Sequence, residues 1–380
     1  MRARAFPLAA ELVRRGHEVT IFLTPYDNLE DSGRDWVQKG VQIRNVKTGP
    51  TLLSYPVALA RLLRMVEDYR PQRIHIFKPK GFAGAAGSYL LLKGQYPTAV
   101  DCDDWEGWGG WNDFKTYPWV VKEYVDRQER WMMSRAPAVT VASLALYDRV
   151  LSVRGKDDGV YYVPNGVASP EVIAQKLINS RSQAEVRRAF DLPSGPIIFY
   201  SGHFEPGESA MFFCRVAAPV AERCNASIVI VGGGPELGKV REFLAARPQA
   251  KSYFFPHLPY EEFLQIVWAS DIAAFPCPDD KVHRSKCSAR IIDYMMMGKA
   301  TVTSAVGQNR EYLVDGDSGL LVPPGDDTAF ANRLELLLQD SDLRHRLGQR
   351  SAERVRRHFN WCGEPLQQCL AAYDQIAATS

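Results

Sequence analysis

The sequence predicts an α/β protein built of two doubly wound domains, and three observations support this prediction. Short apolar, β-branched runs alternate along the chain with segments of helical periodicity, which is typical of parallel sheets covered by helices. The turn Pro164-Asn165-Gly166 interrupts this alternation, and a second α/β series starts at Pro196. A length of 380 residues is sufficient for two domains of ordinary size.

Buried strands are expected where apolar residues run for four to six positions. The expected strands are Val19–Leu23, Arg73–Phe77, Ala138–Ala142, Val160–Val163, Ile197–Tyr200, Ser227–Val231, Ile272–Phe275 and Ala300–Thr303. The expected helices include Pro7–Arg15, Val57–Asp68, Lys122–Ser134, Ala210–Arg223, Glu261–Ala269, Ala289–Met297 and Leu343–Arg357, and a last helical segment from Phe359 onward. The chain opens directly on a helix, whereas doubly wound domains open on a strand and a glycine-rich turn.

Composition excludes some functions. The chain has 46 Lys and Arg against 44 Asp and Glu, so nothing indicates nucleic-acid binding. Residues 1–80 carry 14 Lys and Arg against 8 Asp and Glu. This local excess fits either a solvated basic face or contact with an anionic membrane surface or a lipid phosphate.

The cysteines indicate a reducing compartment. There are seven, and no two form a Cys-x-x-Cys pair, which argues against a disulfide framework or a zinc site. No apolar run has the length of a membrane helix, and the Arg-rich amino terminus is unlike a signal peptide. We expect a cytoplasmic protein, with peripheral contact to the inner face of the membrane left open.

Two motifs in the second half are suited to phosphate binding. Gly232-Gly233-Gly234 follows a β-branched strand and precedes a helical stretch, so the backbone there can approach a phosphate. A tight structural turn is the alternative. Further on, Ser288 is a suitable N-cap for a helix that carries Arg290 and Asp293 on one face. These side chains fit a diphosphate and a ribose diol, or they form an intrahelical ion pair on the surface.

The first half has an unusual stretch from Asp101 to Trp111, with four carboxylates and three tryptophans. Carboxylates can accept hydrogen bonds from sugar hydroxyls, and indole faces can stack on sugar rings. No His or Cys has metal-ligand spacing here, so we expect no metal, and a structural Gly/Trp loop is the alternative. Lys78 and Lys80 follow a strand at its carboxyl end, where such folds bind ligands, although a solvated lysine pair is equally simple. His75 alternates with the apolar residues of its strand and is interpreted as a packed histidine.

Several of these stretches resemble the family-4 retaining glycosyltransferases. The segments 298–302 (GKATV) and 315–325 (DGDSGLLVPPG) are very similar to that family's Gly and Pro pattern. The segment 163–167 (VPNGV) resembles its interdomain hinge, 231–236 (VGGGPE) its glycine loop, and 9–20 its "LAxxLxxRGHEVT" motif. Together these similarities cover nearly the whole chain.

The resemblance implies the GT-B architecture, in which two Rossmann-like domains face a cleft. It implies an acceptor-binding domain at 1–165, a nucleotide-sugar-binding domain at 166–358, and a final helix at 359–380 that crosses back to the first domain. The first strand of the amino-terminal domain is then absent from the sequence, which leaves its two neighbours without that partner. We therefore expect the chain to be a shortened version of a longer protein.

The resemblance also implies roles for individual residues. Asp293 corresponds to a ribose ligand, Arg290 and the Gly232–Gly234 loop to diphosphate ligands, and Asp103 lies near the family's active-site histidine. Asp103 and Arg290 are the expected catalytic residues, and the acceptor side is expected to comprise Asp103, Asp104, Trp105 and Lys78. The expected donor-binding residues are Gly202, His203, Gly232, Gly233, Gly234, His257, Leu258, Lys286, Ser288, Ala289, Arg290 and Asp293.

The sequence departs from the family at residues that bind the diphosphate and the donor sugar there. His203 and Glu208 stand where the family has Arg and Lys, and Ser285 stands where it has a Glu that contacts the donor sugar. Either Arg284, Lys286 or Arg290 compensates, or activity is compromised.

The function implied is transfer of a sugar from a nucleoside diphosphate sugar to an acceptor hydroxyl with retention. The nucleotide sugar is a co-substrate and no further cofactor is expected; the acceptor, a glycan, a lipid-linked sugar or a small molecule, is undetermined. Two alternatives stay open. One is a non-catalytic homologue that binds nucleotide or glycan and partners an active transferase, and the other is a sugar-nucleotide epimerase or phosphorylase of the same fold.

Overall fold

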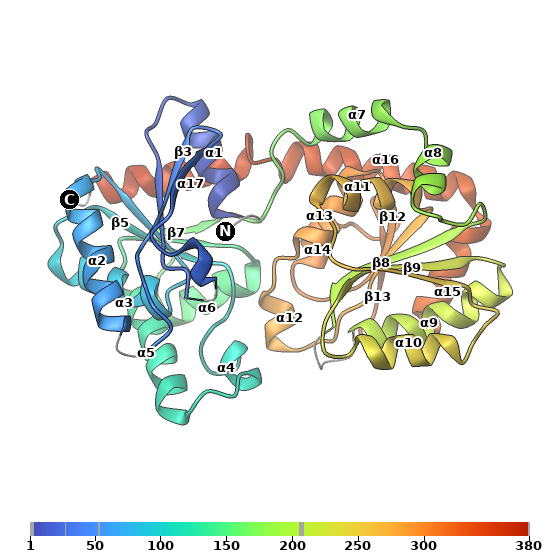
Figure 1. Cartoon of the computed structure of the whole chain (residues 1–380), viewed down its shortest axis with the longest axis horizontal. Coiled ribbons are helices and arrows are strands. Elements are labelled where there is room, and N and C mark those ends of the chain that lie inside the picture. Colours follow the sequence, from blue (N-terminus) through green and yellow to red (C-terminus); the bar gives the residue numbers. More distant parts are fainter. Residues whose placement is uncertain (1–3, 27, 52–53, 205–208, 379–380) are drawn as a thin grey trace. The chain divides into compact units, whose positions relative to one another are not determined.

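A computed structural model describes residues 4–26, 28–51, 54–204 and 209–378 (Figure 1). Glu208 lies outside these described residues. The chain divides into two compact units. The first comprises Met1–Ala168, Ser285–Cys287 and Trp361–Ser380, and the second comprises Ser169–Arg284 and Ser288–Asn360.

The second unit contains one parallel sheet, whose order over the described residues is β10-β9-β8-β11-β12-β13. Its strands are β8 (Ile197–His203), β9 (Ser227–Gly233), β10 (Ser252–Phe255), β11 (Ile272–Phe275), β12 (Ala300–Ser304) and β13 (Leu320–Val322). Helices cover both faces, with α9, α10 and α15 on one side and α11, α13 and α16 on the other (Figure 1). A parallel sheet covered on both faces explains why its central strands read as continuous apolar runs.

The helices of the second unit connect its strands, and in places two helices follow one another directly. They are α7 (Pro170–Ser180), α8 (Gln183–Ala189), α9 (Ser209–Arg223), α10 (Leu237–Ala245), α11 (Tyr260–Ala269), α12 (Lys281–Ser285), α13 (Ala289–Met296), α14 (Asn309–Tyr312), α15 (Asp327–Gln339) and α16 (Ser341–His358).

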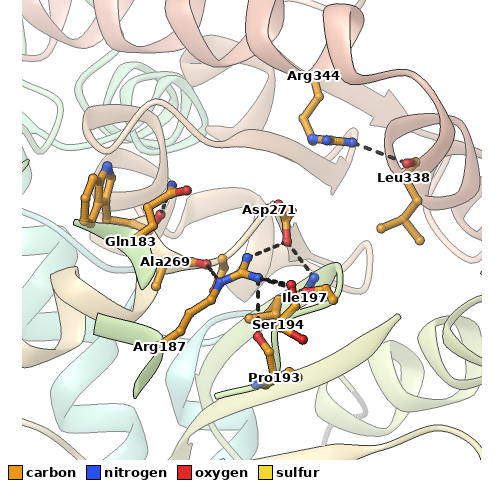
Figure 2. Close-up of polar contacts among 12 residues, drawn as sticks. Gln183, Arg187, Pro193, Ser194, Ile197, Ala269, Asp271, Leu338 and Arg344 are labelled. Carbon is orange, nitrogen blue, oxygen red and sulfur yellow. Dashed lines mark hydrogen bonds and ion pairs between the residues drawn. The ribbon is translucent and has the colours of Figure 1, made fainter. Parts of the chain in front are cut away.

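A polar network fixes the amino ends of β8 and β11 (Figure 2). The Arg187 guanidinium donates to the carbonyl oxygens of Ala269 and Ser194, both at 2.9 Å, and pairs with Asp271 at 2.9 Å. Asp271 in turn accepts a hydrogen bond from the Ile197 amide at 2.8 Å. These contacts tie the amino ends of the two strands to the helix Gln183–Ala189 that carries Arg187.

The first unit has its strands in two sheets. The order is β1-β3-β2 in one and β4-β5-β6-β7 in the other, and among the described residues β1 and β4 are each paired along one side only. The strands are β1 (Thr20–Leu23), β2 (Asp35–Gln38), β3 (Val41–Asn45), β4 (Ile74–Phe77), β5 (Thr98–Cys102), β6 (Ala138–Val141) and β7 (Val160–Tyr162). The half-exposed side chains of β1 contrast with the fully buried ones of β5 and β6.

The carboxyl-terminal helix packs on the second of these sheets. Ala372 and Ile376 of α17 form an apolar cluster with Ala99 and Ala138 of β5 and β6. None of the helices in the described parts of the chain combines the length and the hydropathy that a bilayer-spanning segment requires. The helices of this unit are α1 (Ala5–Arg14), the 3-10 turn η1 (Leu29–Asp31), α2 (Ser54–Tyr69), α3 (Gly81–Lys93), α4 (Trp111–Phe114), α5 (Trp119–Arg135), α6 (Leu144–Arg154) and α17 (Glu364–Ala378).

Candidate functional site

The glycine loop lies at the carboxyl edge of the second sheet, between β9 and α10. A Cβ on Gly232 would lie 2.0 Å from the Gly202 carbonyl oxygen, and one on Gly234 would lie 2.7 Å from the Phe204 amide nitrogen. Both glycines have φ values, 137° and 148°, that other residues rarely adopt. A Cβ on Gly233 would meet nothing within 4 Å. The backbone is therefore tightly packed at Gly232 and Gly234 but faces open space at Gly233.

The amino terminus of α13 also has polar groups without partners. Ser288 occupies the N-cap position, as expected, but its side chain makes no capping hydrogen bond. The expectation that the hydroxyl caps the first turn is thus wrong, because the hydroxyl does not reach those amides. Ser288 is buried, and its Oγ has no hydrogen-bond partner among the described residues. A buried hydroxyl and the first-turn amides of a helix are together suited to an anion.

Arg290 and Asp293 do not form the intrahelical pair that the sequence left open. Across the described residues, no carboxylate lies within 4 Å of the Arg290 guanidinium. Asp293 instead accepts a hydrogen bond from the Tyr260 hydroxyl of α11 at 2.7 Å. Burial raises the pKa of Asp293 to about 7, although Tyr260 and the charge of Arg290 both lower it. Arg290 is consequently available to an anionic ligand.

Tyr294 holds α13 against the carboxyl end of β8. Its hydroxyl lies 2.7 Å from Ser201 Oγ and accepts the Ser201 amide at 3.0 Å. Burial raises the pKa of Tyr200 on the same strand, and the charge of Arg290 lowers it, which places Arg290 near this strand end. A Cβ on the neighbouring Gly202 would lie 2.6 Å from the Tyr200 hydroxyl. The N-terminal part of α13 and the end of β8 therefore share one edge of the sheet.

The remaining expected donor-side residues fall into two groups. His203 ends β8, and its ring centroid lies 6.2 Å from that of His257, which precedes the half-buried Leu258. Of the cations proposed to compensate for the family's Arg and Lys, Arg284 is paired with Asp279 at 2.5 Å. Lys286 belongs to the first unit, where its ammonium lies 5.6 Å from the centroid of the Trp111 ring. Arg290, on α13 of the second unit, has no carboxylate within 4 Å among the described residues.

The acidic loop of the first unit surrounds Lys78. The Lys78 ammonium lies 2.7 Å from Asp104, 3.6 Å from Asp103 and 3.6 Å from Glu106, while Lys80 pairs with the other oxygen of Glu106. Burial alone would lower the pKa of Lys78, but these three carboxylates raise it. The expected acceptor-side residues Lys78, Asp103 and Asp104 thus lie together, at the carboxyl ends of β4 and β5.

Asp103 differs from the other carboxylates of this loop. Burial raises its pKa to about 6, with Asp104 and Asp101 adding to the shift and Lys78 opposing it. A carboxyl with this pKa can accept or release a proton near neutral pH. Among the described residues no group of three His, Cys, Asp or Glu side chains is arranged to hold a metal ion.

Helix α5 positions the acidic loop by accepting hydrogen bonds from its backbone amides. Glu129 is fully buried, accepts the amides of Glu106 at 2.8 Å and Gly107 at 3.1 Å, and pairs with Arg149 at 2.5 Å. A Cβ on Gly107 would lie 2.3 Å from an oxygen of Asp126, so a glycine is required there. Sequence reasoning missed Glu129 and Asp126, since nothing in their local pattern links them to a loop about twenty residues earlier.

Three other residues of this region make contacts that stabilise the first unit. Asp101 is fully buried and forms a two-pronged ion pair with Arg4 at 2.7 and 2.5 Å. His75 is packed, as predicted, with its ring nitrogens 3.0 Å from the hydroxyls of Tyr373 and Thr140, and burial lowers its pKa to about 4. Trp105 has the Arg149 guanidinium 4.0 Å from its ring centroid, so one indole face is already covered.

Comparison with protein families covers most of the chain. Residues 1–166 match the family described as glycosyl transferase 4-like domain, and residues 195–340 match the family described as glycosyl transferases group 1. The chain belongs to the group 1 glycosyltransferases. The first matched segment lies in the first unit, and the second lies in the second unit apart from Ser285–Cys287.

Curated members of the glycosyltransferases are similar to this chain at low identity. An alpha-D-kanosaminyltransferase of Streptomyces kanamyceticus is 24% identical over 172 residues, which is 45% of this chain and 43% of that protein. A D-inositol 3-phosphate glycosyltransferase of Xylanimonas cellulosilytica is 22% identical and covers 95% of this chain and 88% of its own length. The chain thus matches less than half of the first relative and most of the second.

Solved structures of glycosyltransferases show the same GT-B fold of two Rossmann-like units. Sucrose-phosphate synthase of Thermosynechococcus elongatus superposes with a TM-score of 0.73 at 20% identity, over 98% of this chain and 92% of that one. Anabaena Alr3699/HepE in complex with UDP-glucose superposes with a TM-score of 0.69 at 15% identity, over 98% and 94%. At these identities the likeness establishes the fold.

Proposed function

We propose that this group 1 glycosyltransferase moves a sugar from a nucleoside diphosphate sugar to an acceptor hydroxyl with retention of configuration. The observation that supports this most directly is the set of polar groups without partners at the amino terminus of α13. The Ser288 hydroxyl and the Arg290 guanidinium lie there, at the edge of the sheet where Gly233 faces open space. A diphosphate supplies the negative charge and the acceptor oxygens that these groups lack.

We assign a role to each of the expected donor-binding residues of the second unit, which together form the donor half-site. Arg290 and the first-turn amides of α13 stabilise the charge that develops on the departing diphosphate. Asp293 accepts hydrogen bonds from the ribose hydroxyls, and Tyr260 orients its carboxylate. Backbone groups at His257 and Leu258 contact the base. His203 binds the sugar or the phosphate in the place where the family has an arginine.

On the acceptor side, Asp103 and Asp104 accept hydrogen bonds from acceptor hydroxyls, and Lys78 holds both carboxylates in position. We propose that transfer requires no bound metal, because Arg290 and the α13 amides provide the positive charge at the leaving group. Addition of EDTA then leaves the rate unchanged, and a loss of activity that Mg²⁺ restores would contradict this part of the proposal.

The comparisons support a nucleotide sugar as donor but do not select the acceptor. Alr3699/HepE was solved with UDP and with UDP-glucose, which makes uridine nucleotides the first to try. The relatives' names include a kanosaminyl transfer and a transfer to D-inositol 3-phosphate. The first name specifies the sugar that is moved and the second an acceptor, so the acceptor screen for this chain spans glycans, lipid-linked sugars and small polyols.

The test starts with calorimetric titration of the purified chain with UDP, GDP, ADP and TDP. Binding of one nucleotide raises the melting temperature by mass action, and the Asp293→Ala variant loses most of this affinity. The sugar of that nucleotide is then offered with the acceptor screen, and the anomeric proton coupling of the product is read by NMR. A folded chain that binds none of the nucleotides would overturn the donor assignment, and an inverted product would overturn retention.

A second function, nucleotide binding without transfer, is favoured by one observation. His203 stands at the position where the family has an arginine that grips the diphosphate. If this loss disables catalysis, nucleotide binding persists while no acceptor yields product, and His203→Arg restores or raises turnover. A wild-type chain that turns over at an ordinary rate excludes this second function.

A further inference from the structure

A cavity of about 380 Å³ lies at the amino edge of the sheet in the second unit. Asp271 and Lys299, which immediately precede β11 and β12, line it together with residues of α7 and α16. Among the residues that the structure describes, those assigned to the donor half-site do not line it. Its volume falls within the range of small-molecule sites, near the lower end.

Three cationic side chains line this cavity without an ion-pair partner. They are the buried Lys299, the half-buried Arg344 and the exposed Arg356. In the described parts of the chain, none of the three has a carboxylate within 4 Å. By contrast, Arg350 and Arg357 of the same helix α16 both pair with a glutamate. Unpaired lysine and arginine side chains around one cavity are suited to a phosphate group.

The acidic side chains of the lining do not neutralise these cations. Asp271 pairs with Arg187 at 2.9 Å (Figure 2), and Glu171 of α7 is exposed. The three cations and Arg187 outnumber the two carboxylates by two. The cavity therefore has an excess of positive charge.

Lys299 keeps one donor for a ligand. Its ammonium donates to the carbonyl oxygens of Trp268 at 2.6 Å and Ser270 at 2.8 Å, which uses two of its three N–H groups among the described residues. Burial lowers the pKa of Lys299 to about 8, while the charge of Asp271 opposes this shift and the charges of two arginines add to it. An anion in the cavity would stabilise the charged form of Lys299.

Arg344 also keeps donors for a ligand. Its Nη1 donates to the carbonyl oxygens of Leu337 at 2.6 Å and Leu338 at 3.4 Å, at the end of α15 (Figure 2). Its Nε and Nη2 make no hydrogen bond to a residue within the described ranges. A guanidinium with two free nitrogens can bind two oxygens of one phosphate.

The cavity and the donor half-site contact opposite ends of one helix. Ser288 and Arg290 lie at the amino terminus of α13, whereas Met296 and Met297 at its carboxyl terminus line the cavity. A helix of eight residues is about 12 Å long. A ligand in the cavity is therefore distinct from the nucleotide proposed for the donor half-site.

We propose that this cavity binds a sugar phosphate, with the phosphate against Lys299, Arg344 and Arg356. Gln175 of α7 and Gln349 of α16 also line the cavity, and their amides can exchange hydrogen bonds with sugar hydroxyls. A monosaccharide with one phosphate suits a volume of about 380 Å³. This binding involves the second unit alone and does not depend on the transfer reaction.

The test is isothermal titration of the purified chain with glucose 6-phosphate, inorganic phosphate and glucose. We expect glucose 6-phosphate to bind, inorganic phosphate to bind more weakly and compete with it, and glucose to give no detectable binding. Arg356→Gln weakens glucose 6-phosphate binding by about tenfold, because it removes one charge-assisted contact. Arg346→Gln is the matched control, since Arg346 is exposed on the same helix but does not line the cavity.

Two further variants separate this site from folding and from the donor half-site. Ala174→Phe places a ring in the cavity without changing a charge, so we expect it to abolish glucose 6-phosphate binding and to leave nucleotide binding and the melting temperature unchanged. Arg290→Gln retains glucose 6-phosphate binding, because Arg290 does not line the cavity.

Three outcomes would count against the proposal. The absence of glucose 6-phosphate and phosphate binding by the folded wild-type chain would overturn it. Binding that is lost in Arg290→Gln but kept in Arg356→Gln would place the phosphate at the donor half-site and overturn it as well. Binding of inorganic phosphate alone, weakened by Arg356→Gln, would support the anion site and overturn the assignment of a sugar.

Discussion

The two candidate half-sites differ in which kind of polar group lacks a partner. In the first unit, Lys78, Lys80 and Arg149 are each matched by carboxylates, and the loop amides are accepted by Glu129 and Asp126. The buried atoms without a hydrogen bond there include two acceptors, Asp103 Oδ1 and Glu106 Oε1. In the second unit, the Ser288 hydroxyl has no hydrogen-bond partner in the parts of the chain described, and the Arg290 guanidinium has no carboxylate within 4 Å there. Because these two groups are donors, the second half-site is the one suited to a ligand's negative charge. In the first, burial raises the pKa of Asp103 to about 6.

The largest expected effect is on activity, from a change in the donor half-site of the second unit. Arg290→Gln removes a charge that acts on the leaving group, and we expect a fall in kcat of about 10² to 10³ with little change in melting temperature. Steady-state kinetics and a thermal melt measure the two quantities. Arg284→Gln is the matched control, because its pair with Asp279 is exposed and therefore screened by solvent. Equal activity losses in the two variants would contradict the assignment of Arg290.

In the acceptor half-site of the first unit we expect the reverse, a loss of stability without a loss of nucleotide affinity. Glu129→Gln removes the nearer carboxylate of the buried Arg149 and leaves Asp126 at 3.7 Å as the other, and we expect a loss of about 3 kcal/mol in the free energy of unfolding. Nucleotide affinity stays unchanged because the change lies in the other unit. Urea unfolding followed by tryptophan fluorescence gives the stability, with Glu353→Gln in the half-exposed ion pair of α16 as control. A stable Glu129→Gln chain with weakened nucleotide binding would remove the distinction between the two half-sites.

Two neighbouring glycines sharpen the comparison within the donor loop. Ala at Gly233 meets no atom within 4 Å, so Gly233→Ala retains the wild-type melting temperature and weakens nucleotide binding by about tenfold, through crowding of the ligand. Ala at Gly232 collides with the Gly202 carbonyl and must adopt a φ of 137°, so Gly232→Ala lowers stability first. Calorimetric titration and thermal melts of both variants decide the matter. Unweakened nucleotide binding by Gly233→Ala would place the ligand elsewhere.

The smallest expected effect is on the pH dependence of nucleotide affinity. Burial raises the pKa of Asp293 to about 7, so the carboxylate is ionised above that pH and protonated below it. An ionised carboxylate accepts ribose hydroxyls more strongly, and we expect affinity to rise about fivefold as the pH increases through 7. Because the folded pKa exceeds the unfolded one, this group's contribution to stability falls as the pH rises from about 4 to 7.

Two variants test this assignment by isothermal titration across pH. Asp293→Asn flattens the profile. Tyr260→Phe shifts its midpoint upward, because the lost hydrogen bond favoured the ionised form. An unchanged midpoint in Tyr260→Phe would indicate that another group titrates.

The fold was largely predictable from sequence because buried parallel strands are continuous apolar runs. The expected strands correspond to β1, β4, β6, β7, β8, β9, β11 and β12, with ends that differ by up to three residues. No strand was predicted at β2 and β3, since Asp35–Asn45 carries polar residues on its exposed side, nor at the aromatic β10. The helix α3 was missed because Gly81, Gly84 and Gly87 lower its intrinsic helix propensity.

The candidate site was predictable in location but not in its contacts. The glycine loop, α13 and the acidic loop all lie at carboxyl ends of strands, as periodicity and turn residues indicated. The contact of Tyr260 with Asp293 joins residues 33 apart, and that of Glu129 with the Glu106 amide joins residues 23 apart. Such contacts are set by how helices pack on a sheet, which local sequence patterns do not report. The same limit applies to Ser288, whose type fits a cap although the capping bond is absent.

The helix α5 has a mechanical consequence. Its first turn carries the exposed Trp119 and Val120, and its later turns carry Asp126 and Glu129, which hold the amides of the loop at residues 106–108. A helix is stiff along its axis, so a force or constraint applied at one end is transmitted to the other with little loss. Because one helix carries both groups of residues, a restraint on the first turn of α5 also restrains the loop at residues 106–108.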